Sequence, residues 1–145
     1  MPPVLQALSD QVTAYRRLAK LAEAQHDCVQ QSRTDELLEI LTRRQEVIDQ
    51  IFTLEKTISP AKKQWAAFVD GLSDDDRAKA EALLTESKSL LEEITTSDRA
   101  DAMILQQQKL NVGKQINAAG AARTVNKTYA AAAYGKPVAR MDVQR

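Results

Sequence analysis

The stretch VLQALSDQVTAYRRLAKLAEAQHDCVQQ, residues 4–31, decides the fold of this chain. Its seam positions recur alternately every three and four residues over nearly four heptads: Leu5, Leu8, Val12, Tyr15, Ala19, Ala22, His26 and Val29. That spacing places them on one face of a helix and is typical of long helices that pack at a shallow angle. The stretch therefore predicts a first long helix with one face buried against other helices.

A second long helix is expected directly after the first. The connection of residues 32–34 is short, and a short connection returns the chain antiparallel. Thr34 suits the N-cap, and the residue before Pro60 is disfavoured in the α conformation, so the helix is predicted over residues 35–58. A polar gap at Arg43-Arg44-Gln45 interrupts its predicted apolar face. That face consists of Leu37, Leu38, Leu41, Val47, Ile48, Ile51, Phe52, Leu54 and Ile58.

Two more helices follow in the pattern. Residues 61–72 carry Trp65, Phe68, Val69 and Leu72 and predict a short helix that ends at Gly71 and caps one end of the bundle. Ser73, followed by three aspartates, is a strong helix start, because the hydroxyl caps backbone N–H groups and carboxylates favour the positive end of the dipole. The apolar period then predicts a helix from Asp74 to about Ala119. The fold class is all-α, an antiparallel helical bundle or hairpin with three long helices, the last one longest, and one short helix.

Composition agrees with this fold class and divides the chain. Only four Gly, four Pro and 4% aromatic residues leave little room for a sheet. The formal net charge is zero, but residues 73–101 carry nine acidic and four basic groups, whereas residues 109–145 carry seven basic groups and one acid. Eight alanines fall within residues 118–133. We expect a helical bundle domain over residues 1–117 and an Ala-rich helical extension with a basic tail over residues 118–145.

The expected helix lengths indicate where a partner binds. At 1.5 Å per residue the first two long helices span ~42 and ~36 Å, but the last spans roughly 70 Å, so about 25–30 Å of it overhangs or bends back. An uncovered apolar stripe of this kind is typical of a surface that binds another helix. The predicted partner-binding residues are Leu105, Val112, Ile116, Ala119, Val125, Tyr129 and Tyr134.

The sequence offers little that could support catalysis. Glu23 and His26 have the spacing of one half of a di-iron site, but a complete site needs a second such pair, and His26 is the only histidine. The residues after His26 lack the lysine and glycine usual in phosphotransfer domains, and Cys28 has no basic residue one turn away. No Gly-rich phosphate loop, Cys-x-x-Cys pair or Gly-x-Ser-x-Gly elbow occurs. We expect no enzyme activity, no metal and no cofactor.

Other features limit the partners and the compartment. The basic charges of the C-terminal region are too sparse to favour nucleic-acid binding. The N-terminus lacks the pattern of a signal peptide, and no run approaches ~18 apolar residues, so no stable membrane insertion is expected. The single cysteine fits a reducing compartment. The sequence therefore predicts a cytoplasmic protein that binds other proteins.

Two blocks resemble a known family. LAKLAEAQ at residues 18–25 and DELLEILTRRQEVI at residues 35–48 look like the N-terminal hairpin of flagellar export chaperones of the FlgN and FliT type, with Arg43-Arg44-Gln45 at the basic-polar step of the second helix. The later Asp98-Arg-Ala-Asp101, the Gln-rich helix and the closing Tyr134-Gly135 are also similar to some members. The resemblance implies a type III secretion chaperone whose C-terminal helical region binds helical terminal segments of hook-associated or cap proteins. It also implies docking on the export gate, sometimes through a tyrosine such as Tyr129 or Tyr134.

Two other readings stay open at this point. The runner-up is a structural coiled-coil adaptor whose C-terminal helix completes a homodimer. The third is an enzyme or phosphotransfer bundle built around His26. A tight dimer that buries residues 105–135 would favour the adaptor, whereas loss of function on replacing His26, with folding intact, would favour the third reading.

Overall fold

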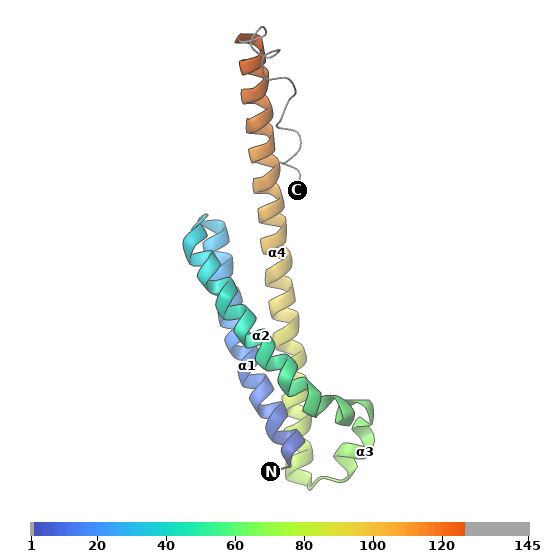
Figure 1. The fold of residues 1–145 in the computed structure, drawn as a ribbon. Coiled ribbons are helices and arrows are strands. Elements are labelled where there is room, and N and C mark those ends of the chain that lie inside the picture. The colour runs from blue at the N-terminus through green and yellow to red at the C-terminus, as the bar shows by residue number, and fades with distance from the viewer. Residues whose placement is uncertain (1, 127–145) are drawn as a thin grey trace. The chain divides into compact units, whose positions relative to one another are not determined.

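The computed structural model describes the backbone of residues 2–126 and the side chains up to Asn117. The described residues form four helices and no strand, with α1 at Pro3–Gln30, α2 at Thr34–Lys63, α3 at Trp65–Asp70 and α4 at Asp74–Asn126 (Figure 1). The predicted all-α fold with a long final helix is confirmed. Helix α4 runs unbroken through Gly113 and Gly120 and is longer than the sequence pattern indicated.

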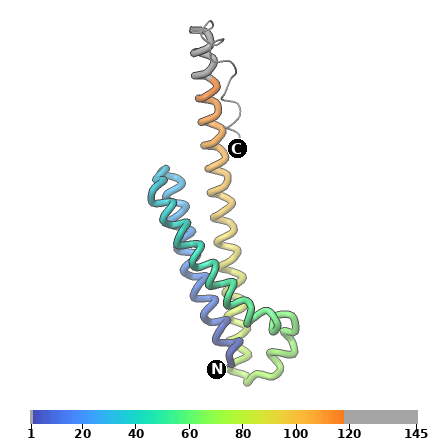
Figure 2. The backbone as a smooth tube through the Cα atoms, viewed as in Figure 1, coloured from blue at the N-terminus to red at the C-terminus, as the bar shows by residue number. Residues whose placement is uncertain are grey.

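The chain divides into two compact units, Met1–Ala102 and Met103–Arg145. In the first unit α1 and α2 lie side by side as an antiparallel hairpin, and the initial part of α4 packs along it (Figures 1 and 2). The second unit contains the rest of α4. The predicted division at residues 117 and 118 stays a prediction, because residues 127–145 lie outside the described part of the chain.

The turn between α1 and α2 has a specific backbone geometry. The N–H of Arg33 donates to the carbonyl of Cys28 at 2.9 Å, and the N–H of Ser32 donates to the carbonyl of Val29 at 3.3 Å. Together these bonds form a Schellman motif, which satisfies the last carbonyls of α1. Ser32 has φ of 54°, a left-handed conformation that glycine usually supplies. This local geometry ends α1 and reverses the chain.

Helix α1 supplies most of the core. The predicted seam is confirmed: seven of its eight positions are buried, and His26 is half-buried. One core cluster joins Ala14, Tyr15, Leu18, Ala19 and Ala22 of α1 to Ile51 and Ile94. A second cluster joins Leu5, Ala7 and Leu8 to Ile58 and Ala80. The core is therefore built from α1 in the middle, with one face each of α2 and α4.

The second cluster is closed by α3 and its neighbours. Trp65 and Phe68 pack on it, as does Leu72, and the rings of Trp65 and Phe68 lie 5.3 Å apart between centroids. Gly71 follows the last residue of α3, and the hydroxyl of Ser73 accepts a hydrogen bond from the N–H of Asp76 at 3.1 Å. The helix start at Ser73 is confirmed, and the short capping helix is present but begins at Trp65, since residues 61–63 of the predicted range 61–72 belong to α2.

Several expectations for α2 are wrong. The helix continues through Pro60 to Lys63, because Pro60 is exposed in the last turns and the carbonyl that loses its helical donor can be hydrated. Arg33 rather than Thr34 stands at the N-cap. Three members of the predicted apolar face are solvent-exposed: Leu38 at 59%, Leu41 at 44% and Phe52 at 64%. The hairpin covers only the side of α2 that carries Ile51 and Ile58.

Candidate partner-binding site

An exposed apolar stripe runs along α4 within the second unit. Leu105, Val112 and Ile116 are 43%, 52% and 41% exposed. Their separations of seven and four residues place them on one face of the helix. We call this face the α4 stripe. Among the described side chains of the second unit, these three form an exposed apolar row on one helix face.

The register of α4 explains why this stripe exists. Counting in steps of four and three, the buried positions Ile94 and Asp101 of the first unit share a helical face with Leu105. The sequence thus keeps one apolar period along the whole helix. In the first unit the α1–α2 hairpin packs against that face and buries it. From Leu105 onward the apolar residues on the same face are exposed. A face patterned for burial but exposed to solvent is a surface that another helix can cover.

The same segment carries a second, smaller apolar face and a uniform charge. Met103 and Leu110, at 74% and 50% exposed, are seven residues apart and lie on the side opposite the α4 stripe. The charged groups of residues 103–117 are Lys109 and Lys114, both exposed, and no acidic residue occurs there. Lys109 lies beside the α4 stripe and Lys114 beside the second face, so a helix that binds at the stripe meets an apolar surface with one basic neighbour, which disfavours a basic ligand.

The remaining predicted site residues extend beyond the described side chains. Ala119 and Val125 lie within α4, but the structure describes only their backbone. Tyr129 and Tyr134 lie outside the described residues. The structure therefore places Leu105, Val112 and Ile116 on one exposed face, and the assignment of all seven residues to a partner site stays a prediction.

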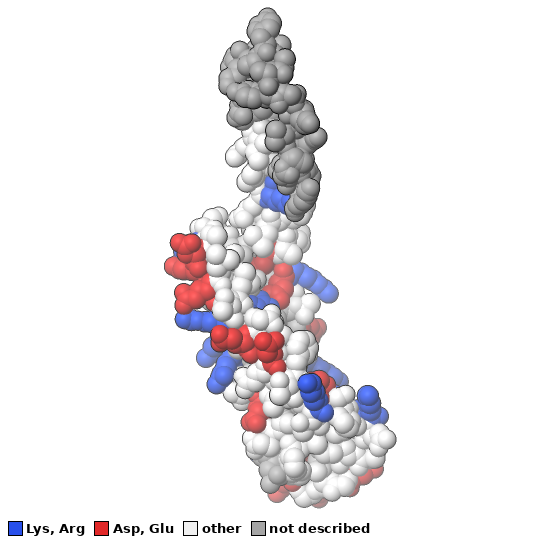
Figure 3. Space-filling view, in the orientation of Figure 1, with Lys and Arg blue, Asp and Glu red and all other residues white. Residues whose placement is uncertain are grey.

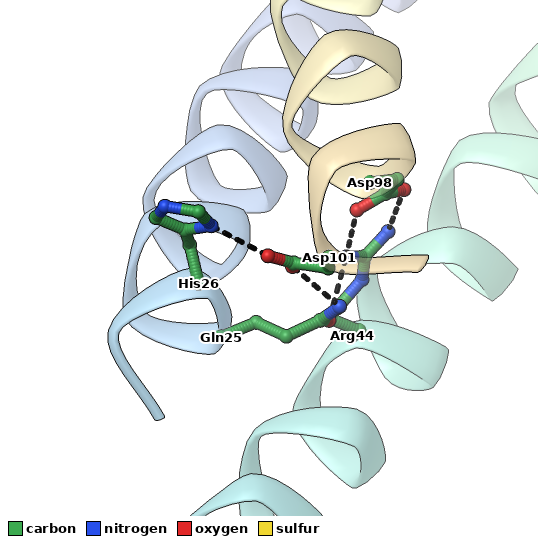
Figure 4. A network of polar contacts seen from close by, with 5 residues as sticks. All are labelled: Gln25, His26, Arg44, Asp98 and Asp101. Carbon is green, nitrogen blue, oxygen red and sulfur yellow. Dashed lines mark hydrogen bonds and ion pairs between the residues drawn. The ribbon is translucent and has the colours of Figure 1, made fainter. Parts of the chain in front are cut away.

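A buried polar cluster ties the three long helices of the first unit together (Figure 4). Arg44 of α2 donates to both carboxylate oxygens of Asp98 of α4 at 2.8 and 2.9 Å, and to Oε1 of Gln25 of α1 at 2.7 Å. Hydrogen bonding to Asp98 raises the pKa of Arg44 above its ordinary value, against the opposing effect of burial. Bidentate geometry of this kind fixes orientation as well as adding stability. We call these residues, with the two described next, the polar clamp.

Two further side chains complete the polar clamp. Asp101 is 1% exposed and accepts a hydrogen bond from Nε2 of Gln25 at 3.1 Å. Nδ1 of His26 lies 2.6 Å from Oδ1 of Asp101, and as a carboxylate Asp101 can only accept, so the ring donates from Nδ1. A buried carboxylate needs such partners, because its desolvation is otherwise costly. His26 thus has a structural partner in the fold.

Sequence reasoning missed the polar clamp. The sequence showed Arg43-Arg44-Gln45 only as a polar gap in the apolar face of the second helix, and Asp98 and Asp101 only as part of the family resemblance. Arg43 is indeed at the surface, paired with Glu39 at 2.7 Å, whereas the side chain of Arg44 is only 12% exposed. The available signal was the coincidence of polar breaks in all three helical faces. Opposite charges that interrupt neighbouring seams are expected to meet.

The residues considered above for catalysis or metal binding are Cys28, Glu23 and His26. Cys28 is buried, and that burial raises the pKa of its thiol, which lowers the thiolate population. Glu23 is exposed, and among residues 2–126 no three His, Cys, Asp or Glu side chains are grouped so that they could hold a metal ion.

A comparison with protein families supplies the deciding observation. The family model described as FlgN protein matches residues 1–134. The chain belongs to the FlgN family. No curated protein and no solved structure gives a match. FlgN proteins are flagellar export chaperones, so the resemblance seen in the hairpin sequence is confirmed over nearly the full chain.

Family membership fixes the general function. As a FlgN protein, the chain is a flagellar export chaperone in the general sense, and its partners include secreted flagellar proteins. FlgN is a family of chaperones and is not known as an enzyme family. Within residues 2–126, none of the helices combines the length and hydropathy needed to cross a lipid bilayer.

Proposed function

We propose that this FlgN protein is a cytoplasmic chaperone that binds a helical terminal segment of a hook-associated or cap-type protein on the α4 stripe and delivers it to the export apparatus. The observation that carries the proposal is the exposure of Leu105, Val112 and Ile116 on a face that is patterned for burial. Helix docking into such a face is a recurrent mode of peptide recognition, with anchors at i, i+3, i+4 and i+7.

The energetics suit reversible carriage. Each of three half-exposed aliphatic side chains can gain on the order of 1 kcal/mol when a partner covers it, since full burial contributes about 1.5–3 kcal/mol. A micromolar complex corresponds to about −8 kcal/mol, which a few such anchors and the apolar residues of the cargo can supply. Binding of this strength shields an aggregation-prone helix and still permits release without a bond-breaking step.

The basic charge of the segment refines the expected cargo chemistry, because Lys109 lies beside the α4 stripe and Lys114 on the opposite side of the helix. Lys109 and Lys114 are exposed on the same segment, and residues 103–117 hold no acid to offset them. We therefore expect the cargo helix to carry neutral or acidic residues beside its apolar anchors. Tyr129 and Tyr134 are proposed to serve at the export gate, in a step separate from the apolar contact.

The test is a cargo titration with matched variants of the full chain. Leu105→Ser, Val112→Ser and Ile116→Ser are combined in one variant, and Gln107→Ser, Asn111→Ser and Gln115→Ser, all at exposed positions, form the control. Calorimetric titration with a synthetic C-terminal segment of a hook-associated protein should show a loss of roughly 30-fold or more for the first variant and little change for the control. Full cargo affinity in the first variant, with helicity unchanged, would refute the site.

The oligomeric state of the free protein distinguishes the chaperone from the alternative hypothesis, a structural adaptor that forms a homodimer. The exposed α4 stripe is also compatible with a homodimer through the C-terminal helix, so light scattering on the free protein is informative. A monomer that binds cargo with one-to-one stoichiometry supports the carrier. A tight dimer that Val112→Ser converts to monomer, with no cargo affinity in either form, supports the adaptor instead.

A further inference from the structure

A second exposed apolar face lies on α2, within the first unit. Leu38, Leu41, Ile48 and Phe52 follow the three-and-four spacing of a helix seam, with Gln45 at the centre of the row. Leu38, Leu41 and Phe52 are 59%, 44% and 64% exposed, and Ile48 is half-buried. We call this row the α2 stripe. Scattered exposed apolar residues are ordinary, but a row on one helix face, centred on a single glutamine, is a docking surface.

One edge of the α2 stripe is acidic. Each residue that follows a stripe position lies about 100° further around the helix, so these residues form one edge. They are Glu39, Thr42, Glu46, Asp49 and Thr53, all exposed, with three acids and no base. Red acidic side chains are visible beside uncharged surface on the hairpin in the space-filling view (Figure 3).

Most of this acidic charge is uncompensated within the described residues. Arg43 pairs with Glu39 at 2.7 Å. Asp49 accepts a hydrogen bond from the neutral amide of Gln45 at 2.8 Å, and neither Asp49 nor Glu46 has an ion pair in the described part of the chain. Arg44 is held by Asp98 in the polar clamp, and the exposed Lys56 lies one turn after Phe52, beyond the C-terminal end of the row. The edge therefore presents net negative charge beside exposed leucine and phenylalanine.

We propose that the α2 stripe docks a basic amphipathic helix of a partner protein, at a site separate from the cargo-binding α4 stripe. The apolar seam of that helix covers Leu38, Leu41 and Phe52, and its Lys or Arg flank lies along Glu46 and Asp49. Charge complementarity selects this occupant. In an antiparallel two-fold pair of α2 helices, the acidic edge would lie against the same edge of the second copy, and like charges disfavour that pairing.

The two exposed stripes thus differ in the charge they select. The α4 stripe has only lysines in its segment, and the α2 stripe has an acidic edge. A helix with basic flanks is attracted to the second and repelled by the first, and the reverse holds for an acidic helix. The chaperone can therefore hold cargo and a basic partner at the same time without competition between them.

The test uses synthetic probes on the full-length protein. One probe is an amphipathic helical peptide with leucine at the seam and lysine on both flanks, and its control has glutamate on the flanks. Calorimetric titration should show binding of the lysine probe that weakens with added salt, and at least about tenfold weaker binding of the glutamate probe. The variant Leu38→Ser with Phe52→Ser should lose about tenfold or more in affinity for the lysine probe.

Matched variants separate the apolar and the ionic contributions to binding of the lysine probe. Glu46→Gln with Asp49→Asn should lower the affinity for the lysine probe several-fold and reduce the salt dependence of that binding. Gln50→Ser with Thr57→Ser changes exposed positions of the same helix away from the stripe and should leave binding unchanged. If the double stripe variant folds poorly, Phe52→Ser alone answers the question, since that side chain is the most exposed of the three. Cargo titration of the stripe variant should give the wild-type affinity, which keeps this result distinct from the α4 test.

Several outcomes would overturn the proposal. Equal binding of both probes would refute the α2 stripe as a docking site for a basic helix. Wild-type affinity of the stripe variant for the lysine probe would refute it as well. A wild-type dimer that the stripe variant makes monomeric assigns the surface to a second copy. Displacement of the lysine probe by a synthetic peptide of residues 127–145 assigns it to the chain's own C-terminal segment.

Discussion

Residues 74–102 and 103–117 of α4 are parts of one helix with one apolar period, yet their side chains have different surroundings. In the first part Ala80 and Ile94 are 0% and 5% exposed, because α1 and α2 cover that face. In the second part Leu105 and Val112 are 43% and 52% exposed. The comparison teaches that periodicity predicts which face of a helix is apolar. Whether that face is buried depends on which other helices of the fold pack against it.

The polar clamp sharpens this contrast, since all of its residues belong to the first unit. Asp98 and Asp101 are followed directly by the boundary of the first unit at Ala102. Up to that boundary, helix packing is completed by both apolar and ionic contacts. Beyond it, within the described side chains of α4, Leu105, Leu110, Val112 and Ile116 are all exposed.

The largest expected effect comes from matched leucine truncations in the two units. Leu8→Ala removes a side chain that is 0% exposed and should lower the free energy of unfolding by about 2–5 kcal/mol. Leu110→Ala removes one that is 50% exposed and should change it by less than about 0.5 kcal/mol. Urea denaturation followed by circular dichroism measures both. Equal destabilisation by the two variants would break the comparison.

An intermediate effect is expected from the polar clamp. Arg44→Gln leaves Asp98 and Gln25 without their donor and should cost about 1–3 kcal/mol, since Asp98 retains partial access to water. Arg43→Gln removes only an exposed i,i+4 pair with Glu39 and should stay within about 0.5 kcal/mol. The same denaturation experiment compares the neighbouring arginines. Similar values for the two would mean that the clamp adds nothing beyond a surface ion pair.

The smallest effect is expected from an exposed ion pair between α1 and α4. Arg16 donates to Glu86 at 2.7 and 2.8 Å, and this hydrogen bonding lowers the pKa of the Glu86 carboxyl. A lowered folded-state pKa stabilises the protein above the ordinary value of 4.5, and this contribution is lost as the pH falls through the lowered folded-state value. Glu86→Gln should therefore lower the melting temperature slightly at neutral pH and leave it unchanged in strong acid.

The control for that pH experiment is Glu92→Gln, at an exposed position of the same helix. It should show no pH-dependent difference from wild type. High salt should reduce the Glu86→Gln effect, because both partners are accessible to solvent. An unchanged effect at high salt or in strong acid would contradict the ionic origin.

The sequence predicted the helices better than their surroundings. The α1 seam from Leu5 to Val29 was readable because three-and-four spacing reports one helix face directly. The exposure of Phe52 was not, since a helix in a small bundle can carry two apolar faces and spacing alone does not say which one the neighbours cover. The continuation of α2 through Pro60 was missed because an exposed last turn tolerates a lost hydrogen bond.

The candidate site was predictable only in part. Leu105, Val112 and Ile116 share a face by spacing, and a length mismatch between helices suggested that this face is free. The pairing of Arg44 with Asp98 depends on the heights at which three helices meet, which no single helix pattern contains. The acidic edge of α2 is visible in the sequence only after the structure shows which leucines are exposed.

The lone tryptophan of this chain, Trp65, lies beside Phe68 at the end of the hairpin core. Its indole emission is therefore an intrinsic fluorescence signal for the loosening of the first unit. The double substitution Trp65→Phe and Leu105→Trp would move the fluorophore into the second unit. Each unit of this chaperone can thus be watched by itself without an attached dye.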